Sequence, residues 1–289
     1  MKRNLLFSML LIVCAVFGCS AQIFYKVEGN GLTKPSYLFG THHFASEAIL
    51  DSMPEVSKAL KEVDCVVGEL DMTDNPMAMA AAMQPYMLAA ADSTLSKLLP
   101  KERYDELNAK YAELTGGIAL SMLEPMKPIV AEVTLAGVLA SKEMPEAGQL
   151  DTYFQKLAKR DSVKVVGLET PEFQAQVLFG YIPVSRQLES LVKTLENPEE
   201  CVKSTRELTD AYLAKDADAL WKVAKESAVD NEGEFFEILL DKRNEAWLKK
   251  LPDMMKAEPL FVAVGALHLY GDVGLVEGLR KLGYTVTPF

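Results

Sequence analysis

The chain has 289 residues, of which 49% are hydrophobic and 25% are charged, and its formal net charge is −11. This is the composition of an ordinary globular protein that is long enough to bury a sizeable core. The acidic balance argues against nucleic acid as a partner, because binding phosphates requires clustered lysine and arginine side chains.

The N-terminus has the layout of an export signal. Lys2 and Arg3 precede an almost wholly apolar run at residues 5–17, and small residues follow at 18–21. Such a run is typical of a secretory signal and is too short for a comfortable membrane span. We therefore expect residues 1–21 to be a signal peptide and residues 22–289 to form a single domain that is exported to the periplasm.

Two modes of signal cleavage stay open. Residues 16–19 resemble a lipobox, in which Cys19 is lipidated and becomes the new N-terminus, although Phe17 is unusually bulky for that motif. The rival is ordinary cleavage after Ala21. The sequence slightly favours the lipoprotein, which would be tethered to a membrane by its lipid alone. No other run approaches the ~20 apolar residues of a membrane span.

The mature chain begins with the pattern of a β-hairpin, with strands at residues 23–27 and 37–39 around a turn at 28–31. A helix is predicted at 46–62 and an apolar strand at 65–67. A helical stretch then covers residues 76–160, with breaks expected near Pro85, Pro100, Gly116-Gly117 and Pro145.

The second half alternates in the same way. The predicted elements are a strand at 163–166, helices within 171–250, a strand at 260–264, a helix at 273–282 and a strand at 285–287. Short apolar strands separated by helices predict an α/β fold, with a small, mostly parallel sheet flanked by many helices. Residues 76–160 are predicted to be a large helical insertion.

Cys65 and Cys201 are the cysteines of the mature chain beyond Cys19. An exported location permits a disulfide between them. Cys65 lies within an apolar run, however, which favours a small buried hydrophobic residue instead.

The predicted strands end in a shared pattern, in which an apolar run meets a glycine and then an ionisable residue. The residues concerned are Glu69, Glu169 and His268, and the hairpin leads similarly to His42 and His43. Ligands of open α/β sheets bind at the carboxyl ends of the strands, where a glycine permits a tight turn. We therefore expect these side chains to converge on one crevice.

All three histidines of the chain lie in these strand-end turns. Two imidazoles with one or two carboxylates can hold a divalent metal and leave a position open. Such a metal lowers the pKa of a bound water and polarises a carbonyl group. Glu69 would be a metal ligand or the general base. The sequence lacks an HExxH motif, and a Ser-His-Asp triad stays open although no GxSxG motif is present.

Several motifs resemble the TraB/GumN/Tiki family, in the order expected and over nearly the whole mature chain. They are the two GxxH motifs at residues 40–43 and 265–268, Glu-Leu-Asp at 69–71, Gly-Leu-Glu-Thr at 167–170 and Arg-Asn at 243–244. The resemblance implies a fold related to erythromycin esterases and ChaN-like haem-binding lipoproteins. It also implies a metal-dependent hydrolase acting on peptides or proteins, since Tiki members are metal-dependent proteases and TraB members limit peptide-pheromone activity.

By this resemblance His43 and His268 are metal ligands and Glu69 is the essential acid, with Mn, Co or Zn as the metal. His42 becomes an alternative or outer ligand. Arg243 is a candidate to pair with a substrate carboxylate or oxyanion, or else forms a structural salt bridge.

The remaining assignments are structural. Glu169 is expected to cap or support the fold, and Asp71 is expected to cap the turn that follows it. The alternative function is a non-catalytic, exported lipoprotein that binds haem or iron through the same histidines. A third alternative is an interaction protein with a vestigial site, but both intact GxxH motifs argue against it.

Overall fold

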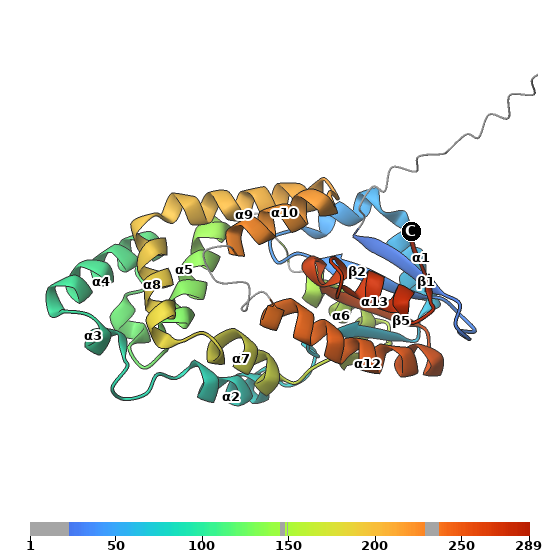
Figure 1. The fold of residues 1–289 in the computed structure, drawn as a ribbon, viewed down its shortest axis with the longest axis horizontal. Helices are drawn as coiled ribbons and strands as arrows, with labels where there is room; N and C mark the ends of the chain where they lie inside the picture. Colours follow the sequence, from blue (N-terminus) through green and yellow to red (C-terminus); the bar gives the residue numbers. More distant parts are fainter. Residues whose placement is uncertain (1–22, 145–147, 149, 229–236) are drawn as a thin grey trace, which may run out of the picture.

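The computed structural model describes residues 23–144, 148, 150–228 and 237–289. The predicted signal peptide, Cys19 and the break near Pro145 lie outside the described residues. Within them the chain forms one six-stranded sheet with helices on both of its faces and a helical region at one side (Figure 1). None of the described helices is long and apolar enough to cross a membrane.

The strands lie in the order β4-β3-β5-β2-β1-β6. The central pairs β4–β3, β3–β5 and β5–β2 are parallel, and the edge pairs β2–β1 and β1–β6 are antiparallel. This confirms the predicted α/β fold, the hairpin and the mostly parallel sheet. The strands are β1 (Phe24–Glu28), β2 (Ser36–Thr41), β3 (Cys65–Gly68), β4 (Lys164–Gly167), β5 (Leu260–Gly265) and β6 (Thr285–Pro288).

Helices connect these strands and build the helical region. Those before β4 are η1 (Glu47–Ser52), α1 (Pro54–Glu62), α2 (Pro76–Met87), α3 (Leu95–Leu98), α4 (Lys101–Thr115), η2 (Leu120–Leu123), α5 (Pro128–Glu143) and α6 (Leu150–Arg160). Those after it are α7 (Pro171–Gly180), α8 (Val184–Glu196), α9 (Pro198–Leu213), α10 (Ala217–Ala228), the π-helical turn η4 (Glu237–Asp241), α12 (Lys242–Ala257), η5 (Ala266–Leu269) and α13 (Leu275–Lys281).

One expected boundary differs from the structure. The helix predicted at residues 46–62 is two elements, because Pro54 has no N–H to donate and starts α1 where the 3₁₀ turn η1 ends. The break predicted near Pro85 is confirmed, since α2 ends at Met87, two residues after Pro85. The breaks near Pro100 and Gly116 are confirmed, because α4 begins after Pro100 and Gly116 ends it in the left-handed conformation.

The sheet is buried on both faces because alternate residues of each strand point to opposite sides. On β5, Phe261 and Ala263 pack in a core with α1, α6 and the adjoining ends of α9 and α10. Val262 and Val264 pack in a second core with α12 and α13. A third core joins α4, α5 and α8 in the helical region. Cys65 belongs to the second core, and Cys65 and Cys201 are both free, so the disulfide does not form.

The glycines at the strand ends serve a purpose other than the one predicted. Gly40, Gly68, Gly167 and Gly265 do not have the positive φ of a tight turn. They are needed instead for close packing. A Cβ atom on Gly40 would lie 2.8 Å from the Cα atom of Ala266, and one on Gly68 would lie 2.3 Å from Nε2 of Gln155.

Candidate functional site

The carboxyl ends of the four adjacent strands β4, β3, β5 and β2 lie along one edge of the sheet, and each one delivers an ionisable side chain. Glu69 follows β3 directly, Glu169 follows β4 by two residues, and His268 lies in η5 directly after β5. His42 and His43 follow β2. The order and parallel pairing of these strands therefore place the five residues along one edge of the sheet.

Arg243, at the start of α12, lies at the centre of this edge and uses all five of its N–H groups within the protein. Nε and Nη2 donate to the two oxygens of Glu169 at 3.1 and 2.5 Å, and Nη2 also donates to Oε2 of Glu69 at 2.6 Å. Nη1 donates to Leu239 O and to Nε2 of His268, both at 3.1 Å. The guanidinium group is buried, so this arrangement leaves it no donor for a substrate and matches the salt-bridge interpretation.

Glu69 is the member of this cluster that reaches solvent, with 21% of its side chain exposed against 4% for Arg243, Glu169 and His268. Its Oε1 accepts from Gly265 N at 2.9 Å. Burial acts to raise the pKa of Glu69, but electrostatic interactions with His268 and Arg243 and hydrogen bonds from Gly265 and Arg243 outweigh it and hold the pKa at about 2. A carboxylate with so low a pKa is a weak base at neutral pH, which suits a ligand better than a general base.

His268 is a buried, neutral histidine with a fixed tautomer. Its Nδ1 lies 2.7 Å from Oδ1 of Asn244, which can only accept, so the proton is on Nδ1 and Nε2 carries a lone pair. Burial lowers the pKa of His268 to about 3. Its ring packs against Trp247, with centroids 4.4 Å apart, which fixes the orientation of the imidazole.

His43 differs from His268 in being exposed, with 77% of its side chain accessible. Its Nδ1 lies 3.0 Å from Oδ2 of Asp151, at the start of α6, and the other oxygen of Asp151 accepts from the hydroxyl of Thr41. The hydrogen bond to Asp151 raises the pKa of His43 above its usual value. Asp151 thus directs Nε2 of His43 away from itself, as outer carboxylates do for metal-binding histidines.

Replacing Asp151 with asparagine should lower the pKa of His43 towards the ordinary value for histidine. An amide oxygen still accepts a hydrogen bond but carries no charge to stabilise the imidazolium. NMR titration of the imidazole resonances would measure the shift. Asp161→Asn, a change at an exposed aspartate at the end of α6, is the matched control. An unchanged pKa of His43 in the Asp151 variant would contradict this account.

His42 makes its hydrogen bond and its ring contacts outside the cluster around Arg243. Its Nε2 lies 2.9 Å from Oγ1 of Thr209 on α9, and its ring centroid is 5.1 Å from that of Tyr212. The Thr209 hydroxyl donates its own proton to Thr205 O and therefore accepts from His42. Burial lowers the pKa of His42 to about 4. In this structure His42 joins the end of β2 to α9.

The two buried histidines predict a loss of stability in mild acid. The pKa values of His268 and His42, about 3 and about 4, lie below the ordinary value of 6.5. As the pH falls below 6.5 the unfolded chain takes up protons that the folded state excludes. Each histidine then lowers the free energy of unfolding by up to about 1.4 kcal/mol per pH unit.

Urea unfolding at pH 7 and pH 5 would measure this effect, with His42→Gln as the matched variant because glutamine can still donate to Thr209. Glu132 and Glu169, whose pKa values are raised by burial, act in the opposite sense and are common to both proteins. The variant should therefore lose less stability than the wild type between the two pH values. Equal losses would contradict the role given to His42.

The predicted ligands are only partly assembled. In the described part of the chain, no three His, Cys, Asp or Glu side chains are grouped closely enough to hold a metal ion. Glu69 and His268 do lie together, with Oε1 and Nε2 3.7 Å apart, whereas His43 is held by Asp151. The donor chemistry nonetheless fits a divalent metal, because both GxxH histidines have Nδ1 bound to an oxygen acceptor, which leaves the lone pair on Nε2, although on His268 this lone pair accepts from Arg243.

The sequence did not single out several residues that shape this edge. Asn244 orients His268, Asp151 orients His43, and Gln174 donates to both Glu69 and Glu169 at 3.0 and 3.1 Å. Asn244 could have been found as the neighbour of Arg243 in the Arg-Asn motif. Asp151 and Gln174 carry no sequence signal, since nothing marks one acidic or amide residue of a helix among many.

Two structural roles were confirmed or refined. Asp71 caps the following turn as predicted, because its Oδ1 accepts from the N–H and hydroxyl of Thr73 at 2.9 and 2.7 Å. Glu169 supports the fold through Arg243. The cap of α7 is instead Thr170, whose hydroxyl accepts from Phe173 N.

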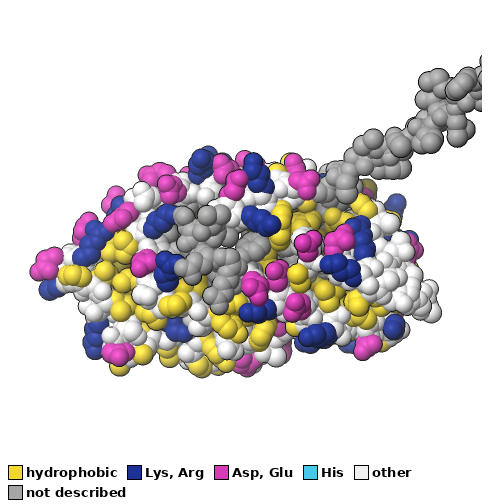
Figure 2. Space-filling model, viewed as in Figure 1, with side chains coloured by type: hydrophobic (Ala, Val, Ile, Leu, Met, Phe, Trp, Pro, Cys, Tyr) yellow, Lys and Arg dark blue, Asp and Glu magenta, His cyan; other side chains and the backbone are white. Residues whose placement is uncertain are grey.

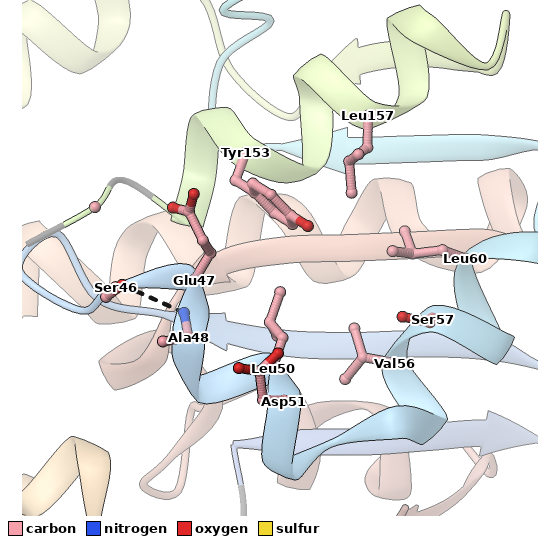
Figure 3. Close-up of a pocket in the computed structure, with 11 residues that line it drawn as sticks. Ser46, Glu47, Ala48, Leu50, Asp51, Val56, Ser57, Leu60, Tyr153 and Leu157 are labelled. Carbon is pink, nitrogen blue, oxygen red and sulfur yellow. Dashed lines mark hydrogen bonds between the residues drawn. The ribbon is translucent and has the colours of Figure 1, made fainter.

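Two hollows flank this edge. One, of about 790 Å³, runs from His43 and Phe44 along α5 past Val133 and Gly137. The other, of about 670 Å³, lies between η1, α1 and α6, where Tyr153 and Leu157 project from α6 towards Leu50 and Val56 (Figure 3). It contains no predicted site residue, so the groove at His43 is the one that adjoins the candidate site.

Comparison with known proteins identifies the family in which this α/β sheet carries two GxxH histidines and a glutamate on one edge. The chain belongs to the TraB/PrgY/gumN family, whose model matches residues 23–288. It is 25% identical over 303 residues to the protein named metalloprotease TIKI1 from Xenopus tropicalis, covering 87% of this chain and 59% of that protein. The chain thus spans little more than half the length of this relative.

Other relatives are similar to the chain at a comparable level of identity. Metalloprotease TIKI2 of Danio rerio is 24% identical over 302 residues, covering 87% of this chain and 58% of the relative. The uncharacterized protein YbaP of Shigella flexneri is 28% identical over 253 residues, covering 85% and 88% respectively. No solved structure matches the chain, so the ChaN-like assignment stays a prediction.

Proposed function

We propose that this protein is a metal-dependent hydrolase that acts on peptide bonds outside the cytoplasm. The observation that supports it is the placement of Glu69 and the two GxxH histidines along one edge of the sheet. Each histidine has its Nδ1 held by an oxygen acceptor, and Nε2 of His268 lies 3.7 Å from an ionised carboxylate oxygen. The likeness to proteins named metalloproteases supports the same proposal.

His43, His268 and Glu69 would hold the metal, which is Mn, Co or Zn by the chemistry of these donors. When bound, the metal supplies a Lewis acid that polarises a carbonyl and lowers the pKa of water. Bringing the three together requires His43 to approach Glu69 and His268. His43 is the exposed member, which leaves it the freedom to do so.

The rest of the edge would bind and orient the substrate. The groove beside His43 is lined by Phe44 and by residues of α5 that are small or apolar apart from Lys142, which suits an extended peptide. Lys and Arg side chains are interspersed with Asp and Glu on the face shown in Figure 2, which also gives no support to nucleic acid as a partner.

The test is elemental analysis of the purified protein beside a His43→Ala/His268→Ala double variant, followed by peptide hydrolysis with and without a chelator. Near-stoichiometric metal that is lost in the double variant, with chelator-sensitive cleavage, is the expected result. Absence of bound Mn, Co and Zn after reconstitution would contradict the proposal. A strong visible absorption band on adding haem, with no cleavage, would support the binding-protein alternative.

A further inference from the structure

Arg243 occupies the position where the proposed function requires a metal ion. Its Nη1 donates to the lone pair of Nε2 on His268 at 3.1 Å, which is the lone pair that a metal would need. Its Nη2 donates to Oε2 of Glu69 at 2.6 Å. One guanidinium cation therefore contacts two of the three expected ligands.

The spacing of these ligands is already close to that of a metal site. Oε1 of Glu69 and Nε2 of His268 are 3.7 Å apart. Two donors that each lie about 2.1 Å from a tetrahedral metal are roughly 3.4 Å apart. The ligand pair therefore has to close by only a few tenths of an ångström.

Arg243 is held by groups other than these ligands. Glu169 accepts from Nε and Nη2, and Leu239 O accepts from Nη1. These three bonds involve neither Glu69 nor His268, so a metal would not compete with them. A metal would compete for Nε2 of His268, which accepts from Nη1 of Arg243.

Resting on the proposed function, we propose that Arg243 is a stand-in cation for the metal. In the metal-free protein it neutralises Glu69, occupies Nε2 of His268 and keeps the two ligands at their spacing. The metal binds only when Nη1 releases His268, so Arg243 weakens metal affinity while preserving the site. Arg243 is a positioning residue that acts through the ligands, and it is not a catalytic one.

Metal affinity separates this role from a purely structural one. The variant is Arg243→Met/Glu169→Gln, which removes one positive and one negative charge together and leaves an amide beside Gln174. Titration with CoCl₂ can be followed by visible absorption and calorimetry. Co(II) should bind the variant at least about tenfold more tightly than the wild type, because binding no longer breaks the hydrogen bond between Arg243 and His268. Circular dichroism verifies folding.

Glu169→Gln alone is the matched control, since it keeps Arg243 on His268, and it should bind Co(II) no more tightly than the wild type. Equal or weaker binding by the folded double variant overturns the stand-in role and leaves the metal site intact. Absence of Co(II) binding in every protein overturns both this role and the proposed function.

A measurement on the wild type keeps the test decisive if the double variant fails to fold. Adding ZnCl₂ to ¹⁵N-labelled protein should shift the guanidinium resonances of Arg243 together with Nε2 of His268, because their hydrogen bond is broken. A shift of His268 without any change at Arg243 would overturn the proposal.

Discussion

Arg243→Met should lower the free energy of unfolding by roughly 3–5 kcal/mol, because removing one partner of a buried ion pair leaves an uncompensated buried charge. Here two carboxylates lose the same cation. Glu169 is 4% exposed and loses two hydrogen bonds, and Glu69 loses its bond to Nη2. Chemical denaturation monitored by circular dichroism would measure the change.

Two comparisons make this result specific. Arg160→Met removes an exposed arginine that pairs with its neighbour Asp161, and it should leave stability nearly unchanged. Adding Glu169→Gln to Arg243→Met should recover part of the loss, because it also removes one of the unpaired carboxylates. A mild effect of Arg243→Met alone would mean that the cluster is better solvated than its burial indicates.

Glu69→Gln should abolish the proposed hydrolysis and most metal retention while the protein stays folded. Loss of an outer partner of a metal ligand alone typically costs about 10–100-fold in affinity or activity. Loss of the solvent-facing carboxylate itself should therefore cost more than about 100-fold. Glutamine has the same shape and can still accept from Gly265, so the fold should tolerate it.

Two measurements on the same preparation would check this expectation: the rate of chelator-sensitive peptide cleavage and the metal content. Glu102→Gln, at an exposed position in α4, is the matched control and should behave as the wild type does. Retained metal with lost turnover would make Glu69 a catalytic group rather than a ligand. Retained turnover would remove Glu69 from the site.

Much of the architecture could be predicted because its causes are local. Short apolar runs such as residues 65–67 and 260–264 are what a sheet buried on both faces requires, and helices between them dictate parallel pairing. The strand-end residues Glu69 and His268 followed from the same logic. The helix that contains Pro85 ends two residues after it, close to the break that the sequence predicted.

The partners of these residues could not be predicted in the same way. Asp151 and Gln174 reach the site only because α6 and α7 pack at particular angles, which depends on the whole core. His42 and His43 are adjacent in sequence, yet one binds Thr209 and the other Asp151. The chain leaves β2 at Thr41 and turns at His43, so adjacent histidines here contact different helices and need not serve one site.

The position of β5 in the sheet has a consequence for how the protein is made. This strand, at residues 260–265, lies between β2 and β3 and pairs with both. Until it leaves the ribosome, the hairpin β1–β2 and the pair β3–β4 have no common partner, and their open edges are prone to aggregate. A chain truncated before residue 260 would lack His268 as well, so the segment that joins the two parts of the sheet also supplies the site with its histidine.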